Sequence, residues 1–179
     1  MVLLVYVDDI VFASNNAQAS KIFKTYLHVC FSIKDLGPLK YFLGIKVTRG
    51  SEGIFLCQRK YALRVQISVD CWGEKPVDFL VKENHKSVLA TGRLLNDATR
   101  YRWLVGKLIY LTITRSELIY AVHILSQFMK SSKEEYMKAA HRVVRYLKGS
   151  AGEGIFLSTR NNLQLYGFCD SDWGGCPFS

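Results

Sequence analysis

The sequence predicts an α+β protein, with antiparallel hairpins and a helix in its first part and amphipathic helices in its second part. Two uninterrupted apolar runs, residues 2–5 and 10–13, flank a short polar turn, which indicates two strands joined as a hairpin. Residues 41–48 and 54–58 predict a second hairpin, joined across a turn that contains glycine. From Thr99 onward the apolar residues instead recur at helical spacing, which predicts helices.

The composition is that of a globular protein that can bury a core. Of the 179 residues, 49% are hydrophobic, which suffices for one domain or a little more. The five cysteines are irregularly spaced and form no CxxC pair, which favours a reduced chain over a disulfide framework. No apolar run is long enough for a membrane span, and Met1 leads into a strand rather than a signal segment. We therefore expect an intracellular protein, cytoplasmic or nuclear or encoded in an organelle, that is not secreted and has no membrane partner.

The turn of the first hairpin carries two adjacent carboxylates, Asp8 and Asp9. Its flanking runs are continuous rather than alternating, which predicts strands buried on both faces. A turn built for stability would favour Asn-Gly or Asp-Gly, whereas two neighbouring carboxylates repel each other. Bound divalent metal offsets such repulsion, and hard oxygen ligands suit magnesium, as in two-metal phosphoryl-transfer sites. The alternative is a solvated acidic turn without a ligand.

The elements between the two hairpins and the helical region follow from local signals. An asparagine pair at 15–16 provides an N-cap for an amphipathic helix that extends to about residue 28. A glycine-proline pair at 37–38 then interrupts regular structure. Residues 61–69 predict a short helix, and residues 71–98 show no sustained period and are interpreted as a connector.

Three apolar stripes predict three helices between residues 99 and 149, packed antiparallel. The stripes consist of Tyr101, Leu104, Val105, Leu108 and Ile109 in the first, Leu118, Ala121, Val122, Leu125 and Met129 in the second, and Tyr136, Ala139, Ala140, Val143 and Leu147 in the third. Ser132 and Glu135 predict a capping box at the start of the third helix, and Gly149 predicts its end.

The net charge of +9 is concentrated in residues 91–150, which hold 11 Lys and Arg against 4 Asp and Glu. Such a segment favours a polyanionic partner. On the third predicted helix, four cations recur at spacings that place them along one side, where they could contact a phosphate backbone. These cations are Lys138, Arg142, Arg145 and Lys148. A solvated helical face explains the same pattern equally well.

The last part of the chain predicts two further strands. Residues 155–158 and 163–169 are largely apolar, and the second run leads directly into Asp170 and Asp172. If the strand continues, these two carboxylates lie on the same face, because side chains alternate along a strand.

Seven segments, in order along essentially the whole chain, resemble the reverse transcriptase to ribonuclease H region of the Pol polyprotein of copia-type LTR retrotransposons. The first is Leu-Val-Tyr-Val-Asp-Asp-Ile at 4–10, and the last is Cys-Asp-Ser-Asp-Trp-Gly-Gly-Cys at 169–176. The other five are residues 34–45, 55–62, 100–112, 120–129 and 145–149.

The resemblance implies a division of the chain into four parts. Residues 1–70 would be the C-terminal part of a reverse-transcriptase palm, built from antiparallel hairpins and a helix, and 71–98 a connector. Residues 99–150 would be a helical thumb or connection. Residues 151–179 would be the first strands of a ribonuclease H-like domain.

The resemblance also implies roles at the first hairpin and the second. Asp8 and Asp9 would be palm carboxylates that bind catalytic magnesium, with Tyr6 and Val7 beside the primer end. The segment Tyr41-Phe42-Leu43-Gly44 would belong to the hairpin that grips the primer backbone. The implied partners are an RNA or DNA template-primer duplex and, in the intact enzyme, deoxynucleotides.

Further roles are implied in the second half. The helices that carry Lys138, Arg142, Arg145 and Lys148 would follow the nucleic acid. Asp170 would be the first acid of a ribonuclease H site and, with Asp172, a metal ligand.

The chain also departs from the family pattern, so its status as an enzyme stays open at this point. A palm needs a third carboxylate upstream of the first hairpin, and the fingers and the remaining ribonuclease H acids would also lie outside these residues. We therefore expect a fragment without polymerase activity of its own. Two alternatives are a module that binds nucleic acid without sequence preference and a retrotransposon relic without function. Residues 114–118 and 75–80 also differ from the family's usual sequence.

Overall fold

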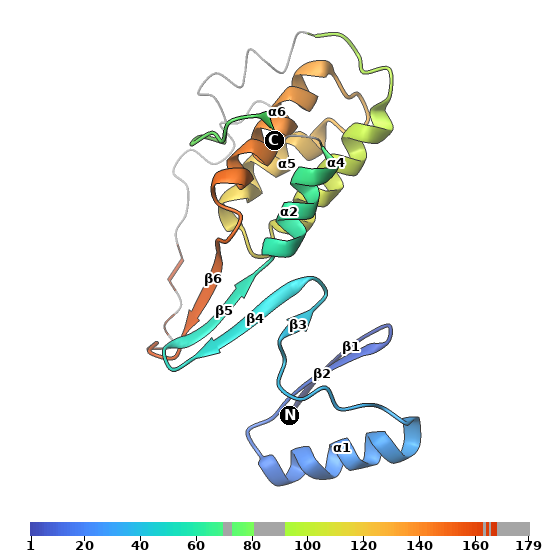
Figure 1. Ribbon diagram of the computed structural model, residues 1–179, viewed down its shortest axis with the longest axis vertical. Helices are drawn as coiled ribbons and strands as arrows, with labels where there is room; N and C mark the ends of the chain where they lie inside the picture. The colour runs from blue at the N-terminus through green and yellow to red at the C-terminus, as the bar shows by residue number, and fades with distance from the viewer. Residues whose placement is uncertain (70–72, 81–91, 163, 165, 168–179) are drawn as a thin grey trace.

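The computed structural model is a mixed α/β chain with antiparallel sheets, which confirms the predicted α+β class. It describes residues 1–69, 73–80, 92–162, 164 and 166–167. Figure 1 shows a hairpin and one helix at one end, and a larger sheet with a cluster of helices at the other. Within the described residues, no helix is long and apolar enough to cross a membrane.

The first hairpin consists of β1 (Val2–Tyr6) and β2 (Asp9–Ala13). Tyr6 pairs with Asp9, which leaves Val7 and Asp8 as a two-residue turn. The predicted hairpin is thus confirmed, but the prediction that its strands are buried on both faces is wrong. Every residue of β1 is exposed, with Val2 at 68%, because these two strands form a sheet of their own that no second described sheet covers.

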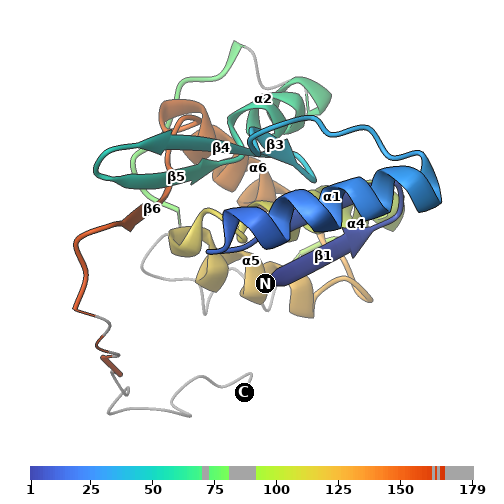
Figure 2. The same ribbon diagram turned by 90° about the horizontal axis from the view of Figure 1, so that it is seen from below.

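Helix α1 (Ala17–Phe31) follows the hairpin and lies beside it in both views (Figures 1 and 2). The side chain of Asn16 accepts a hydrogen bond from the Ala19 N–H at 3.0 Å, so the predicted N-cap is confirmed. Phe23 of the helix packs on Phe12 of β2, with ring centroids 5.2 Å apart. The helix ends later than predicted, at Phe31, and Ser32 follows it in a left-handed conformation with its N–H donating to the His28 carbonyl.

The larger sheet has the antiparallel strand order β3-β4-β5-β6. The strands are Tyr41–Phe42, Ile45–Gly50, Gly53–Cys57 and Gly154–Ser158. The strands predicted at 54–58 and 155–158 are confirmed. The single strand predicted over 41–48 is wrong, because Leu43 and Gly44 both adopt positive φ, +47° and +77°, and reverse the chain between β3 and β4.

The last strand, β6, pairs with β5 where two glycines let the backbones approach closely. A Cβ atom on Gly53 would lie 2.2 Å from the Leu157 carbonyl oxygen, and one on Gly154 would lie 2.1 Å from the Leu56 oxygen. Side chains at these positions would therefore separate the strands. Gly154 follows directly from the end of the helical cluster, so this contact ties the two parts of the chain together.

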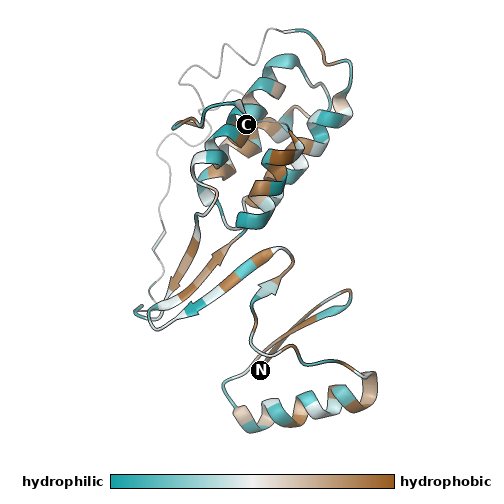
Figure 3. Ribbon diagram, in the orientation of Figure 1, coloured by the Kyte–Doolittle hydropathy of each residue, from teal (hydrophilic) through white to brown (hydrophobic). Residues whose placement is uncertain are grey.

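Within the described residues, the helical cluster consists of four α-helices that share one apolar core, and Figure 3 shows the hydrophobic residues along their ribbons in brown. They are α2 (Arg59–Ser68), α4 (Ala98–Leu111), α5 (Ile119–Gln127) and α6 (Glu134–Gly149), and a 3₁₀ turn at Ser116–Leu118 precedes α5. The short helix and the three later helices are confirmed. Their stripes form the core, except that Ile109 is 43% exposed and Leu111 is buried instead.

The predicted capping box at the start of α6 does not form. The Ser132 hydroxyl donates to the carbonyls of Phe128 and Met129, and the N-cap residue of α6 is Lys133, which makes no side-chain capping bond. The Glu134 N–H instead donates to the Arg93 carbonyl at 3.1 Å. A backbone acceptor from the chain before α4 thus replaces the expected side-chain cap.

Arg115 joins the loop after α4 to the end of α6. Its side chain is 2% exposed and donates to the Ser150 carbonyl and hydroxyl, each at 2.7 Å, and to Glu153 at 3.1 Å. Glu117 accepts from its Nε. The departure from the family sequence at 114–118 is therefore compatible with a buried guanidinium in which each of the three nitrogens donates a hydrogen bond.

The four-part division at residues 70, 98 and 150 stays a prediction. Within the described residues, α2 from the first part packs with α4 and α6, and β6 from the last part pairs with β5 of the first.

Candidate active site

The turn between β1 and β2 presents both acidic side chains to solvent. Asp8 lies in the turn, whereas Asp9 is the first residue of β2 rather than part of the turn as predicted. Both are exposed, and neither makes a hydrogen bond or ion pair with another described residue. Their carboxylates are therefore available to a ligand from solvent.

Val7, which precedes the two acids, has a φ of +49°. This left-handed conformation is rare for a β-branched residue, because its branched side chain clashes with the backbone there. Such strain concentrates at functional sites. The absence of the usual Asn-Gly or Asp-Gly pair is the one sign of this strain in the sequence.

The two carboxylates at this turn could supply part of the ligand shell of one hard divalent cation. Magnesium is commonly bound through one or two carboxylates, with water and substrate phosphates completing its shell. Asp8 and Asp9 could supply those carboxylates. No group of three or more His, Cys, Asp or Glu residues in the described parts of the chain could hold a metal ion. A complete two-metal site thus needs ligands beyond these two residues.

The turn between β3 and β4 contains the other predicted primer-contacting residues. Tyr41 pairs with Lys46 and Phe42 with Ile45, so Leu43 and Gly44 form the tip. The phenol of Tyr110, on α4, donates a hydrogen bond to the Leu43 carbonyl. A helix of the cluster therefore holds this turn in place, a contact that sequence reasoning missed because Tyr110 lies 67 residues away.

Tyr110 is itself held by Tyr61 on α2 and by Gln58, which directly precedes α2. The ring of Tyr61 on α2 meets its ring edge-on, with centroids 4.9 Å apart, and burial together with this neighbour raises the pKa of the Tyr61 phenol. Gln58, which is 2% exposed, donates to the Tyr110 carbonyl and accepts from the Thr114 hydroxyl. Both polar atoms of the Gln58 side chain are therefore hydrogen-bonded. These bonds fix the position of Tyr110, which in turn supports the β3–β4 turn.

Three of the four cations predicted along α6 contact the segment 74–79. Arg142 donates to the Phe79 carbonyl at 3.0 Å, and Arg145 donates to the Lys75 carbonyl at 2.9 Å. Lys148 donates to the Glu74 carbonyl, and the Glu74 carboxylate lies 3.1 Å from Arg145. Lys138 is exposed and makes no hydrogen bond or ion pair with a described residue. The α6 face is thus largely occupied by the connector.

The remaining predicted site residues cannot be placed. Asp170 and Asp172, the predicted ribonuclease H and metal ligands, lie outside the described residues, as does most of the strand predicted at 163–169.

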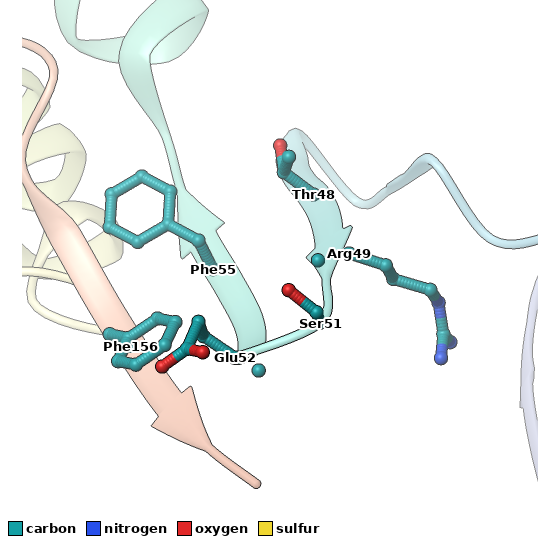
Figure 4. Close-up of a pocket in the computed structure, with 8 residues that line it drawn as sticks. Thr48, Arg49, Ser51, Glu52, Phe55 and Phe156 are labelled. Atoms are coloured by element: carbon teal, nitrogen blue, oxygen red, sulfur yellow. The ribbon is translucent and has the colours of Figure 1, made fainter.

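A shallow pocket of about 240 Å³ lies at the tip of the β4–β5 hairpin (Figure 4). Thr48, Phe55 and Phe156 line it from three neighbouring strands, together with Ser51 and Glu52, while the Arg49 side chain points away from the two phenyl rings (Figure 4). Glu52 is the single carboxylate among its lining residues, whereas the turn between β1 and β2 has two adjacent carboxylates, so the acidic turn is the stronger candidate site.

The exposed acid pair on a strained hairpin turn defines a candidate divalent-metal site in a mixed α/β protein. A model of the reverse transcriptase (RNA-dependent DNA polymerase) family matches residues 1–79. The chain is 41% identical over 173 residues to the retrovirus-related Pol polyprotein from transposon RE1 of Arabidopsis thaliana. That alignment covers 97% of the chain and 12% of the polyprotein.

Two further relatives are shorter. The chain is 36% identical over 176 residues to an uncharacterized mitochondrial protein of Arabidopsis thaliana, covering 98% of the chain and 73% of that protein. It is 28% identical over 174 residues to a putative transposon Ty5-1 protein of Saccharomyces cerevisiae. This alignment covers 96% of the chain and 56% of the yeast protein. No solved structure is significantly similar.

The chain therefore belongs to the reverse transcriptase family, and it corresponds to a part of a retrotransposon Pol polyprotein. The resemblance found in the sequence is confirmed at this level.

Proposed function

We propose that Asp8 and Asp9 are metal-binding carboxylates of an RNA-directed DNA polymerase. The observation that carries this proposal is the exposed acid pair on the two-strand turn, held by a residue with strained backbone. In the intact enzyme, bound magnesium would supply charge stabilisation for nucleotidyl transfer onto a primer 3′ end. An RNA or DNA template-primer duplex and deoxynucleotides are the proposed substrates.

The residues of the chain would have distinct tasks in that reaction. Asp8 and Asp9 would bind the cation, and the β1–β2 hairpin would present them, with Tyr6 and Val7, to the primer end. The β3–β4 turn, Tyr41–Gly44, would contact the primer backbone, and its bond to Tyr110 would keep it in position. We propose residues 1–70 as the palm part and residues 99–150 as the thumb or connection. Residues 151–179 would be the start of a ribonuclease H-like part.

Metal binding tests this proposal directly. Mn²⁺ accepts the same hard oxygen ligands as magnesium and is visible by electron paramagnetic resonance. We expect weak Mn²⁺ binding to the chain that Asp8→Asn and Asp9→Asn each reduce strongly, because each removes one carboxylate ligand. Asp78→Asn, at another exposed acid, is the matched control and should change nothing. Binding that survives both turn substitutions contradicts the proposal.

A second candidate function is sequence-independent binding of nucleic acid, which the excess of cations in residues 91–150 favours. Affinity for duplex DNA should then fall steeply with salt, by about 0.9 logarithmic units per phosphate contact for each tenfold rise in salt. A flat salt response contradicts this function.

We also propose an intracellular site of action, in the cytoplasm, the nucleus or an organelle. The mitochondrial relative supports the organelle as one of these.

A further inference from the structure

The cations of the helical cluster differ in whether they already contact other parts of the chain. Arg142, Arg145 and Lys148 donate to carbonyls of segment 74–79, so part of their hydrogen-bonding capacity is already used within the chain. Arg64 on α2 and Lys107 on α4 make no ion pair with a described residue. In the described part of the chain, cations without an ion pair therefore lie on α2 and α4 as well as at Lys138 on α6.

Two aromatic rings lie close to Lys107. The Lys107 ammonium lies 4.4 Å from the centroid of the Trp103 ring and 5.8 Å from that of Tyr61. Trp103 and Lys107 are four residues apart on α4, and Tyr61 and Arg64 are three apart on α2, so each pair shares a helix face. Trp103 is 44% exposed, which leaves much of its indole accessible.

This surface, formed by Tyr61, Arg64, Trp103 and Lys107, is called the α2–α4 platform below. It is continuous with the β3–β4 turn, because the Tyr61 ring contacts Tyr110, and Tyr110 donates to the Leu43 carbonyl. Tyr41, at the base of that turn, is 47% exposed. An occupant of the proposed primer-contacting turn could therefore extend onto the platform.

We propose that the α2–α4 platform binds single-stranded nucleic acid, with a base against the Trp103 indole and neighbouring phosphates at Lys107 and Arg64. Exposed aromatic rings beside cations are the common means by which proteins hold single strands, because stacking needs unpaired bases. A duplex offers its bases for stacking only at its ends. The inference rests on the proposed function, because it extends the nucleic-acid site beyond the β3–β4 turn.

The test is fluorescence anisotropy of the full chain with a labelled oligothymidylate, an oligouridylate and a DNA duplex. Loss of one stacking contact should weaken binding of Trp103→Ala to the single strands about tenfold. Binding to the duplex should change little. Trp103→Phe should retain most of the affinity, because it keeps an aromatic face. Lys107→Ala should make the slope of log affinity against log salt concentration shallower, by the amount that corresponds to about one phosphate contact.

Tyr120→Ala is the matched control, since Tyr120 is an aromatic residue on α5 that is 57% exposed. It should bind like the unmodified chain. Circular dichroism checks that each variant is folded. Should Trp103→Ala unfold, tryptophan fluorescence still gives an answer, because oligothymidylate should quench the unmodified chain more than Trp103→Phe.

Three results would overturn the proposal: unchanged affinity of folded Trp103→Ala, an equal loss for duplex and single strands, or an equal loss in Tyr120→Ala. Equal loss for the duplex would assign the surface to duplex backbone instead. These results leave Mn²⁺ binding at Asp8 and Asp9 unaffected, so failure of this inference is distinguishable from failure of the proposed polymerase site.

Discussion

Val7 is the residue at which local strain and proposed chemistry coincide. A valine with φ of +49° costs energy that glycine or asparagine at the same position would avoid. The sequence indicated a turn at this place, and its apolar flanks indicated the strands. Backbone strain could not be predicted, because it depends on the Tyr6–Asp9 pairing, which the residue types alone do not fix.

Val7→Asn should stabilise the hairpin, because asparagine tolerates positive φ better than a β-branched residue. If relief of the backbone strain raises the free energy of opening the hairpin by about 1 kcal/mol, hydrogen exchange of the β1 and β2 amides should slow about fivefold. Val2→Asn, at an extended strand position, is the control and should not slow exchange. Unchanged or faster exchange in Val7→Asn would mean that the turn is not strained.

Among the elements, helices were predicted better than strands. Periodic stripes fix which helix face is buried, and Tyr101, Leu104 and Leu108 are accordingly in the core. The β3–β4 turn was missed because its tip is Leu-Gly rather than a typical Asn-Gly pair. The capping box was wrong because an acceptor from a distant segment, the Arg93 carbonyl, took its place. Such long-range contacts leave no local signal.

The pairing of β5 and β6 depends on the close approach at Gly154. Gly154→Ala should lower the free energy of unfolding by about 2 kcal/mol, because the added methyl group would collide with the Leu56 carbonyl and push the strands apart. Urea denaturation measures the change. Gly152→Ala is the control, since a Cβ atom there meets nothing within 4 Å. Equal stability of the two variants would show that the β5–β6 contact is not as close as described.

At the scale of the whole molecule, the exposed hairpin is the feature that the sequence predicted least well. Continuous apolar runs are typical of strands buried on both faces, yet β1 is exposed along its length. The sequence identified the acids, the helices and the family, whereas the supporting role of Tyr110 and the α6 contacts with segment 74–79 required the structure. Both depend on residues distant in the sequence.

An exposed apolar strand with a free edge promotes self-association. Replacing Val2 and Leu4 together by threonine, which keeps β propensity but adds hydroxyl groups, should therefore reduce self-association of the chain. Light scattering over a range of protein concentrations measures this effect. The same pair of substitutions at Ile54 and Leu56 of β5, which are less exposed, should not reduce it. Unchanged self-association of the β1 variant would show that the chain associates through a surface other than β1.

The central claim, that Asp8 and Asp9 serve nucleotidyl transfer, is tested most directly by magnesium-dependent primer extension with a chimera. In the chimera, this chain replaces the matching segment of the RE1 polyprotein, to which it is 41% identical. The unmodified RE1 polyprotein is the positive control. The chain alone should not extend a primer, because its described residues offer two carboxylates where a two-metal site needs more. The chimera should extend it, and Asp8→Asn or Asp9→Asn should abolish nearly all incorporation. Incorporation that persists in both variants, or a folded chimera that is inactive beside an active control, would contradict the claim.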